Sequence, residues 1–351
     1  MLHLDGSYGE GGGQILRTAL SLAATLEQPV HIAQIRAGRS QPGLRPQHLT
    51  AVLALARITK AEVTGGELHS RELTFRPRRP QPGRYLFDVA AKTGSAGSVT
   101  LLAQALLPVL LAAGRPSSLT LRGGTHVAWS PPAHYLLHVF LPALAQLGAQ
   151  VEMNLHRWGW YPRGGGEVGL EIHPARNLSG VEWRTPPDYR GFRAISAASR
   201  LPEHVCRRQG ERLQARLGQD LPVECIEAGG LDPGSMVLLY GPRAGFDALG
   251  AKGKPAEQVA DEAVDAFLTF KDRRAAVDRH LADQIVLYLA RARGPSAFIT
   301  PEITLHLLTN LWVIEQFLGP IFEVKGELGE RGEIFCRGGG RLGSQQPSSR
   351  D

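Results

Sequence analysis

GGGQILRTALSLAATLEQPVHI, at residues 11–32, sets the pattern that organises the whole chain. Its apolar residues recur at the spacing of one helix face, and a short β-like run follows Pro29. A second apolar helix pattern, HLTAVLALARITKAEVTG at residues 48–65, opens at a histidine and also ends in a β-like run. Two such helices bury their apolar stripes when they pack together on a sheet. This stretch therefore predicts a unit of one β-sheet and two helices.

The same order recurs twice more along the chain. The recurrences are GSVTLLAQALLPVLLAAGRPSSLTL with HYLLHVFLPALAQLGAQVEMNL (residues 97–121 and 134–155) and LADQIVLYLARARGPSAFIT with HLLTNLWVIEQFLGPIFEVKG (residues 281–300 and 306–326). Further β-like runs lie at residues 72–76, 85–89 and 167–172. We expect an α+β fold with three repeated β-sheet/two-helix units in its main domain. The alternative is that helices rich in Leu and Ala resemble one another by composition alone.

The stretch between the second and third units breaks this rhythm. It alternates strand-like runs with helix patterns at residues 203–217 and 256–270. The end of the chain is rich in Gly, Ser and Gln, a composition typical of disorder. We predict a main domain at residues 1–179 and 273–337. A smaller α/β domain is inserted at residues 180–272, and a disordered tail follows at residues 338–351.

The composition is that of an ordinary globular protein, with 351 residues of which 43% are hydrophobic and 21% charged. A net charge of +6 permits a polyanionic partner without proving one. The three cysteines are far apart, which indicates neither a disulfide framework nor a zinc site. The N-terminal residues lack the pattern of a signal peptide, and the longest apolar stretch is too short to span a bilayer. We expect a cytoplasmic protein that does not bind membranes.

The first candidate site is DGSYGEGGGQILR, at residues 5–17. A glycine cluster that runs into a helix exposes backbone N–H groups and the positive helix end, a combination that suits phosphate. No Gly-Lys-Ser/Thr follows, so this is not a Walker A loop. Glu10 can hold a divalent cation, and Arg17 lies one helical turn past Gly13. The alternatives are a plain turn, and an acid at Glu10 that interacts with the helix dipole.

A second candidate is RAGRSQPGLRPQH, at residues 36–48. It places Arg36, Arg39 and Arg45 among Gly and Pro just before a helix, which suits bidentate phosphate binding. A solvated basic loop is the alternative. Glycine clusters at residues 94–97, 123–125 and 164–166 also lie at element ends, and they either share a cleft or are ordinary turns.

His306 is the sharpest candidate for a nucleophile. It heads the helix pattern LHLLTNLWVIEQF, where the positive helix end disfavours imidazolium by ~0.3–1 kcal/mol. A nucleophilic histidine must be neutral, because imidazolium has no free lone pair. The alternative is a structural histidine, since His48 and His134 occupy similar places in the other units.

Several of these segments together resemble the RNA 3′-terminal phosphate cyclase family. They are the segments at residues 5–17 and 36–48, the glycine turn at 94–97, YPRGGG at 161–166, LADQ at 281–284 and HLLTN at 306–310. They span nearly the whole chain, and the combination is far more specific than any one of them. The resemblance implies three sheet-and-two-helix repeats with a small domain inserted before the third. It also implies an ATP-dependent enzyme whose partner is RNA with a 3′-terminal phosphate.

The resemblance also implies a mechanism and a set of site residues. His306 would carry AMP, the AMP would pass to the RNA phosphate, and the 2′-hydroxyl would then close a 2′,3′-cyclic phosphate. Glu10 would bind Mg²⁺ or Mn²⁺. The residues implied for the RNA end and its phosphate are Arg17, Arg36, Arg39, Gln47 and His48, and those implied for ATP are Gly11, Gly12, Gly13, Gln104, Asp283 and Gln284.

The chain departs from the family pattern at two places. Residues 301–305 read PEITL where bacterial members often have His-Pro-Ser-Cys, and His280 stands where a stacking tyrosine often occurs. Three other functions stay open: a non-catalytic cyclase-like protein of RNA binding or ribosome assembly, a small-molecule transferase of the enolpyruvyl type, and a plain RNA-binding protein. Only 7% of residues are aromatic, so the sequence shows no aromatic-rich RNA platform.

Overall fold

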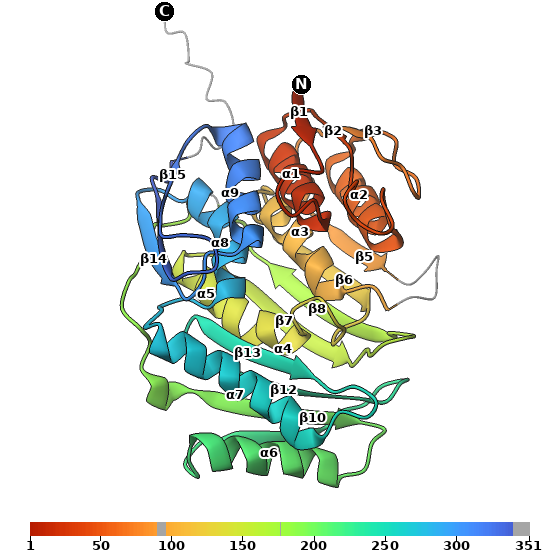
Figure 1. The fold of residues 1–351 in the computed structure, drawn as a ribbon. Helices are drawn as coiled ribbons and strands as arrows, with labels where there is room; N and C mark the ends of the chain where they lie inside the picture. The colour runs from red at the N-terminus through yellow and green to blue at the C-terminus, as the bar shows by residue number, and fades with distance from the viewer. Residues whose placement is uncertain (90–95, 176, 340–351) are drawn as a thin grey trace, which may run out of the picture.

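The structure is a computed structural model that describes residues 1–89, 96–175 and 177–339. Gly94 and Ser95 of the predicted glycine turn, and residues 340–351 of the predicted tail, lie outside the described residues. The expected α+β class is confirmed, because the described residues form four four-stranded mixed sheets covered by helices (Figure 1).

The first sheet and the two helices expected from the opening stretch form one unit. Its elements are β1 (Leu2–Asp5), α1 (Gly13–Leu26), β2 (Val30–Ala33), α2 (Pro46–Thr59), β3 (Glu62–Thr64) and β4 (Leu73–Arg76). The strands pair in the order β1-β2-β4-β3, with β1 and β2 parallel and the other pairs antiparallel. Both helices end at residues in the left-handed region, Glu27 and Lys60, where the chain turns back to the sheet.

The second sheet has the same pairing scheme, in the order β5-β6-β8-β7. Its elements are β5 (Arg84–Asp88), α3 (Val99–Leu111), β6 (Ser117–Gly123), α4 (Ala133–Tyr135), the π-helix η1 (Leu136–Phe140), α5 (Leu141–Gln146), β7 (Val151–Arg157) and β8 (Gly166–Ile172). The single helix expected after His134 is therefore interrupted by a π-helical turn, which ends just before Pro142. Proline has no N–H to continue the regular ladder, which accounts for a break at this point.

The third sheet again follows this scheme, in the order β9-β14-β16-β15. Its elements are β9 (Glu182–Trp183), α8 (Arg279–Arg291), β14 (Ser296–Thr300), α9 (Leu305–Leu318), β15 (Phe322–Lys325) and β16 (Gly332–Cys336). Strand β9 lies within the range predicted for the inserted domain, yet it pairs with β14. We therefore propose that the inserted part begins after Trp183.

A fourth sheet, β11-β10-β12-β13, forms the lower part of the molecule in Figure 1. Its elements are η2 (Tyr189–Gly191), β10 (Arg193–Ser199), α6 (His204–Leu217), β11 (Val223–Glu227), β12 (Gly234–Gly241), β13 (Ala244–Leu249) and α7 (Ala256–Asp272). Phe192, Phe246, Phe267 and Phe270 anchor a hydrophobic core of its own beneath α7. A separate core supports the proposal that this part is a distinct domain.

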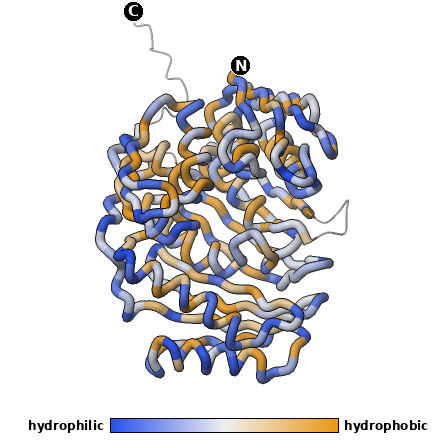
Figure 2. The backbone as a smooth tube through the Cα atoms, viewed as in Figure 1, coloured by the Kyte–Doolittle hydropathy of each residue, from blue (hydrophilic) through white to orange (hydrophobic). Residues whose placement is uncertain are grey.

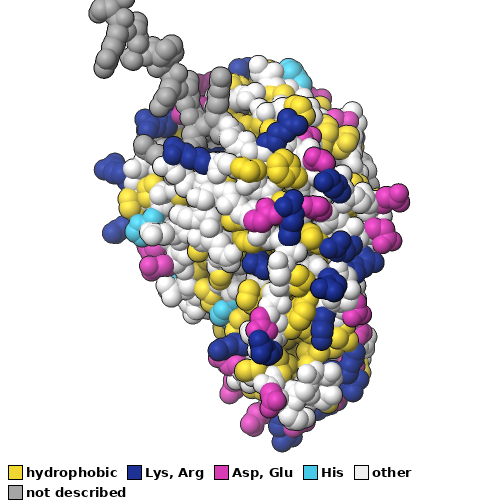
Figure 3. All heavy atoms as spheres, turned by 90° about the vertical axis from the view of Figure 1, so that its left-hand side faces the viewer, with side chains coloured by type: hydrophobic (Ala, Val, Ile, Leu, Met, Phe, Trp, Pro, Cys, Tyr) yellow, Lys and Arg dark blue, Asp and Glu magenta, His cyan; other side chains and the backbone are white. Residues whose placement is uncertain are grey.

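The three other sheets share one large core. Helices α1, α3, α8 and α9 lie side by side at its centre, and Figure 2 shows hydrophobic segments gathered in the interior of the molecule and hydrophilic ones along its edges. Charged residues of both signs are mixed on the surface. Figure 3 shows Lys and Arg interspersed with Asp and Glu over one face. Within the described residues, no helix has the length and apolar character needed to cross a membrane.

Candidate active site

A cavity of about 580 Å³ opens where five helices meet. Helices α1, α2, α3, α8 and α9 all contribute residues to its wall, most of them from the N-terminal half of the helix. The N-terminal end of a helix carries a partial positive charge and unpaired N–H groups. The shared sheet-and-helix scheme therefore directs several positive helix ends toward one space, which suits an anion with several charges.

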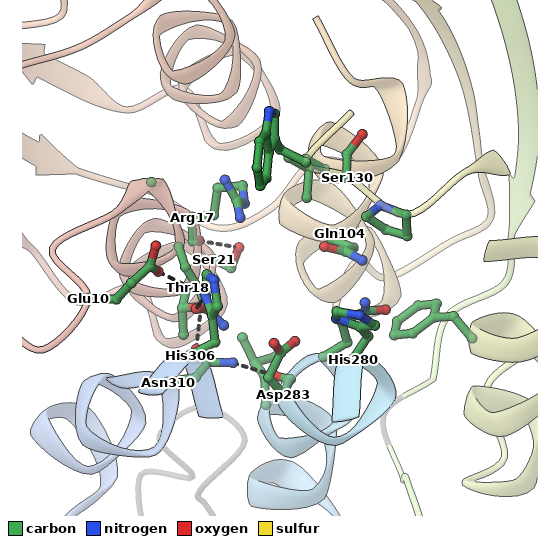
Figure 4. Close-up of a pocket in the computed structure, with 18 of the residues that line it drawn as sticks. Glu10, Arg17, Thr18, Ser21, Gln104, Ser130, His280, Asp283, His306 and Asn310 are labelled. Carbon is green, nitrogen blue, oxygen red and sulfur yellow. Dashed lines mark hydrogen bonds and ion pairs between the residues drawn. The ribbon is translucent and has the colours of Figure 1, made fainter. Parts of the chain in front are cut away.

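Most of the predicted site residues meet at this cavity, as Figure 4 shows for those that it labels. The predicted residues that line it are Glu10, Gly13, Arg17, Arg36, Arg39, Gln47, His48, Gln104, Asp283, Gln284 and His306. Gly11 and Gly12 lie in the loop just before α1 and do not line it. A Cβ at Gly13 would come within 2.2 Å of His48 Nε2, so only glycine leaves room for His48 here.

His306 lies in the first turn of α9, behind the N-cap residue Thr304, whose hydroxyl accepts from Leu307 N. Its Nδ1 is 2.7 Å from Gln14 Oε1 and 2.8 Å from Glu10 Oε2. Both of these oxygens are acceptors, so Nδ1 holds the hydrogen, and its hydrogen bond goes to Gln14 Oε1. The neutral ring then has its free lone pair on Nε2, where a nucleophile needs it.

The surroundings of His306 favour its neutral form. Burial lowers the pKa of His306 below its usual value, Asp283 opposes this, and Arg17 and Arg39 lower the pKa further. The imidazole is therefore neutral at neutral pH. The sequence points to the helix end as one cause, and the structure adds burial, which is the largest of the influences on this pKa, and the charges of Arg17 and Arg39.

The cationic side of the cavity comes from α1 and the loop before α2. Burial lowers the pKa of Arg17 to about 10, although Asp283 opposes it, and lowers the pKa of Arg36 as well. Arg36 donates to the backbone oxygens of Gln41 and Gly43, which fixes its direction. Burial, together with nearby arginines, lowers the pKa of His48 to about 3, so His48 is a neutral hydrogen-bonding group.

Arg39 and Glu10 form an ion pair beside His306. The described residues hold no group of three or more His, Cys, Asp or Glu side chains arranged for a metal ion. Glu10 alone fits a magnesium site in which substrate phosphates and water supply the other ligands. Arg39 balances the charge of Glu10.

The opposite side of the cavity contains buried polar atoms without partners in the described residues. They are Gln104 Nε2, Gln284 Oε1 and Tyr288 OH. A buried polar atom without a hydrogen bond costs free energy, about 1–3 kcal/mol each. A donor and an acceptor lie among them, so a ligand with both kinds of group would satisfy this side of the cavity.

Asp283 lies between the two sides. Burial raises its pKa to about 7, and Asp278 adds to this while His306 and Arg17 oppose it. Asn310 donates to the Asp283 backbone oxygen and accepts from Thr18 Oγ1, which joins α1, α8 and α9 at the cavity.

Sequence reasoning missed several cavity residues. Gln14 and Asn310 belong to quoted motifs and lie at helical spacing from Arg17 and His306, so this spacing could have identified them. Tyr135 and Asp247 carried no such signal, because only the packing of the fourth sheet against α4 brings them to the cavity.

Comparisons of the sequence with a family model and with known proteins agree on one family. A family model described as RNA 3′-terminal phosphate cyclase matches residues 8–324. A protein named RNA 3′-terminal phosphate cyclase from Gloeothece citriformis is 46% identical over 327 residues, covering 90% of this chain and 93% of that protein. A protein of the same name from Thermococcus onnurineus is 47% identical over 345 residues, covering 95% and 98%.

A comparison with solved structures finds similarity to the enolpyruvyl transferase NikO from Streptomyces tendae. The TM-score is 0.38 at 12% identity, over 92% of this chain and 46% of that chain. The chain therefore spans less than half the length of that structure, and a similarity this low has no bearing on function.

Proposed function

The chain belongs to the RNA 3′-terminal phosphate cyclase family, and from that premise we propose that it uses ATP and an AMP attached to His306 to cyclise RNA ends. It is an enzyme that converts the 3′-terminal phosphate of RNA to a cyclic phosphate. The observation that carries the proposed mechanism is the neutral His306, whose Nδ1 is hydrogen-bonded to Gln14 and whose Nε2 has no hydrogen-bond partner among the described residues.

The proposed reaction has three steps. Nε2 of His306 attacks the α-phosphorus of ATP, the bond to the bridging oxygen breaks, and pyrophosphate leaves. An oxygen of the RNA 3′-phosphate then attacks the same phosphorus and displaces His306. Finally the 2′-hydroxyl attacks the RNA phosphorus, loses its proton to water, and displaces AMP as the ring closes. The last step is intramolecular, so correct positioning supplies much of the acceleration.

The two sides of the cavity suit the two substrates. Arg17, Arg36 and Arg39 supply fixed charge for the phosphates of ATP and RNA. The unpartnered atoms of Gln104 and Gln284 offer an acceptor and donors for adenosine. A divalent cation held by Glu10 would neutralise phosphate charge and polarise the α-phosphate.

Covalent labelling tests this mechanism. The protein is incubated with magnesium or manganese and ATP labelled at the α-phosphate, then denatured, and the retained label is counted. We expect acid-labile label on the wild type, none on His306→Ala, and release of the label by RNA that ends in a 3′-phosphate.

An exposed histidine outside the cavity, His173, provides the matched control. His173→Ala should keep the full label. Folded wild-type protein that takes up no label with either metal would rule out the histidine mechanism and favour a non-catalytic function. Label that persists on His306→Ala would assign the nucleophile to another residue.

A further inference from the structure

Trp129 differs from every other tryptophan of the chain. It lines the cavity of the candidate active site, yet it is 99% exposed. Trp160 and Trp183 are 3% and 4% exposed, and Trp158 and Trp312 are half-buried. A single exposed apolar side chain needs no explanation by itself. An indole ring exposed to solvent at the wall of a polar cavity, in contrast, is placed where it can contact a ligand.

The backbone at Trp129 adds a second observation. Its φ of 64° lies in the left-handed region, which a bulky residue rarely adopts and glycine adopts freely. Such strain persists only where the surroundings hold it, and it concentrates at functional sites. The conformation thus projects an indole ring from a position where glycine would be the easier residue.

The loop around Trp129 is held firmly on both sides. Ser130 Oγ donates to Val127 O at 3.0 Å, and Thr100 Oγ1 donates to Pro131 O at 2.7 Å. Two successive prolines follow Ser130 and restrict the backbone further. A rigid loop presents an aromatic ring with little loss of conformational entropy when a ligand binds.

The position of this loop indicates which ligand meets the ring. Ser130 lies next to Gln104, across the cavity from His306 and Asn310 (Figure 4). Adenosine is matched by the buried atoms without partners on Gln104 and Gln284. The ring of Trp129 is open to solvent, as suits the base of a long chain that enters from outside.

We propose that Trp129 is the platform on which the base of the 3′-terminal RNA nucleotide stacks. This inference rests on the proposed function, because the phosphate of the same nucleotide would lie on the cavity arginines. Aromatic side chains are the usual means by which proteins hold single-stranded RNA. Stacking tolerates any base, because every base has a π-face. The enzyme would therefore accept all four terminal bases and favour purines, which stack over a larger area.

The main test measures RNA binding without ATP, by fluorescence anisotropy of a short single-stranded RNA with a 3′-phosphate. Trp129→Gly removes the ring and suits the backbone, so its melting temperature should not fall. We expect it to weaken RNA binding roughly tenfold, and Trp129→Phe to restore part of the loss. Tyr161→Ala, which removes a 74% exposed ring outside the cavity, should bind RNA like the wild type.

A second RNA that lacks only its terminal base identifies the partner of the ring. Removal of this base should weaken binding to the wild type but leave binding to Trp129→Gly unchanged. If the losses from the two changes simply add, the ring and the terminal base do not touch, and the proposal is wrong.

Self-adenylylation without RNA separates the RNA base from adenine. Trp129→Gly should keep the wild-type KM for ATP in this assay. A raised KM for ATP with unchanged RNA binding would assign the ring to adenine and overturn the proposal. The binding measurements need no chemistry, so they report on Trp129 even if His306 takes up no label.

Discussion

The arginines of the inserted part and those of the cavity are held in opposite ways. Between α6 and α7, Arg208, Arg212 and Arg216 each bind carboxylates, and the partners are Glu257, Asp261 and Asp265. At the cavity, Arg17 has no carboxylate bonded to it within the described residues, and Arg36 donates to backbone oxygens. Arg39 is intermediate, because it pairs with Glu10.

The pKa shifts of the two groups have opposite signs. Hydrogen bonds to carboxylates raise the pKa of Arg208 and of Arg216. Burial lowers the pKa of Arg17 and of Arg36. The first group is already neutralised and joins two helices, whereas we propose that the second binds an external anion. The partner of an arginine is thus a better guide to function than its presence in a basic stretch.

Arg17→Ala should have the largest effect on activity and the smallest cost in stability. Loss of a fixed charge beside the reacting phosphates should lower kcat/KM for RNA cyclisation by about 10²- to 10³-fold. Its melting temperature should equal or exceed that of the wild type, because burial without a carboxylate penalises the charge. Steady-state kinetics and thermal unfolding check both parts. A large drop in melting temperature would show that Arg17 is structural.

Salt dependence of RNA binding is the next test of the comparison. Each phosphate contact contributes about one unit to the slope of log affinity against log salt. Arg36→Ala should reduce this slope by about one and weaken binding about tenfold at low salt. Arg208→Ala should change neither quantity, because Glu257 already neutralises Arg208. If the two substitutions had equal effects, the arginines of the cavity and those of the inserted part would not differ in their contribution to RNA binding.

The next test is the pH profile of self-adenylylation, in which the rate at acid pH should differ a few-fold between the wild type and a variant. His306 must be neutral, so the rate should fall as the pH drops through its pKa, which lies below the usual value. Arg17 lowers that pKa and stays charged over the whole range, so Arg17→Gln should move the acid limb to higher pH. Each profile is compared with its own plateau at alkaline pH. A shift of the limb to lower pH would contradict the assigned influence of Arg17.

Arg212→Ala should give the smallest effect. Its side chain is 39% exposed and its pair with Asp261 lies at the surface, where ion pairs contribute little. The melting temperature should fall by about one to three degrees with no change in kcat/KM. A loss of activity without a loss of stability would indicate that α6 contacts the RNA.

Much of the fold follows from the sequence because its helices and strands have clear periodicity. The pattern at residues 256–270 became α7, and the run at residues 167–172 became β8. Strand β9 was missed, because two residues cannot show a period and only pairing with β14 defines it. The π-helix was missed because a widened turn leaves the apolar pattern of η1 unchanged.

The site was predictable where its residues cluster in the sequence. Glu10, Arg17 and His306 lie in glycine-rich or helix-starting motifs whose chemistry is local. The environment of these residues was not predictable, because the raised pKa of Asp283 depends on burial between three helices. Trp129 gave no signal, since exposure and backbone conformation exist only in the folded chain.

The hydrogen bond from His306 to Gln14 joins residues 292 positions apart. During synthesis the first two sheets and their arginines emerge long before α9 does. His306, the residue proposed to receive AMP, is therefore among the last residues of the candidate site to be synthesised. Because non-local contacts form late, the nucleophile should be oriented only when the third sheet closes. Cyclase activity then requires a completely translated chain as well as a folded one.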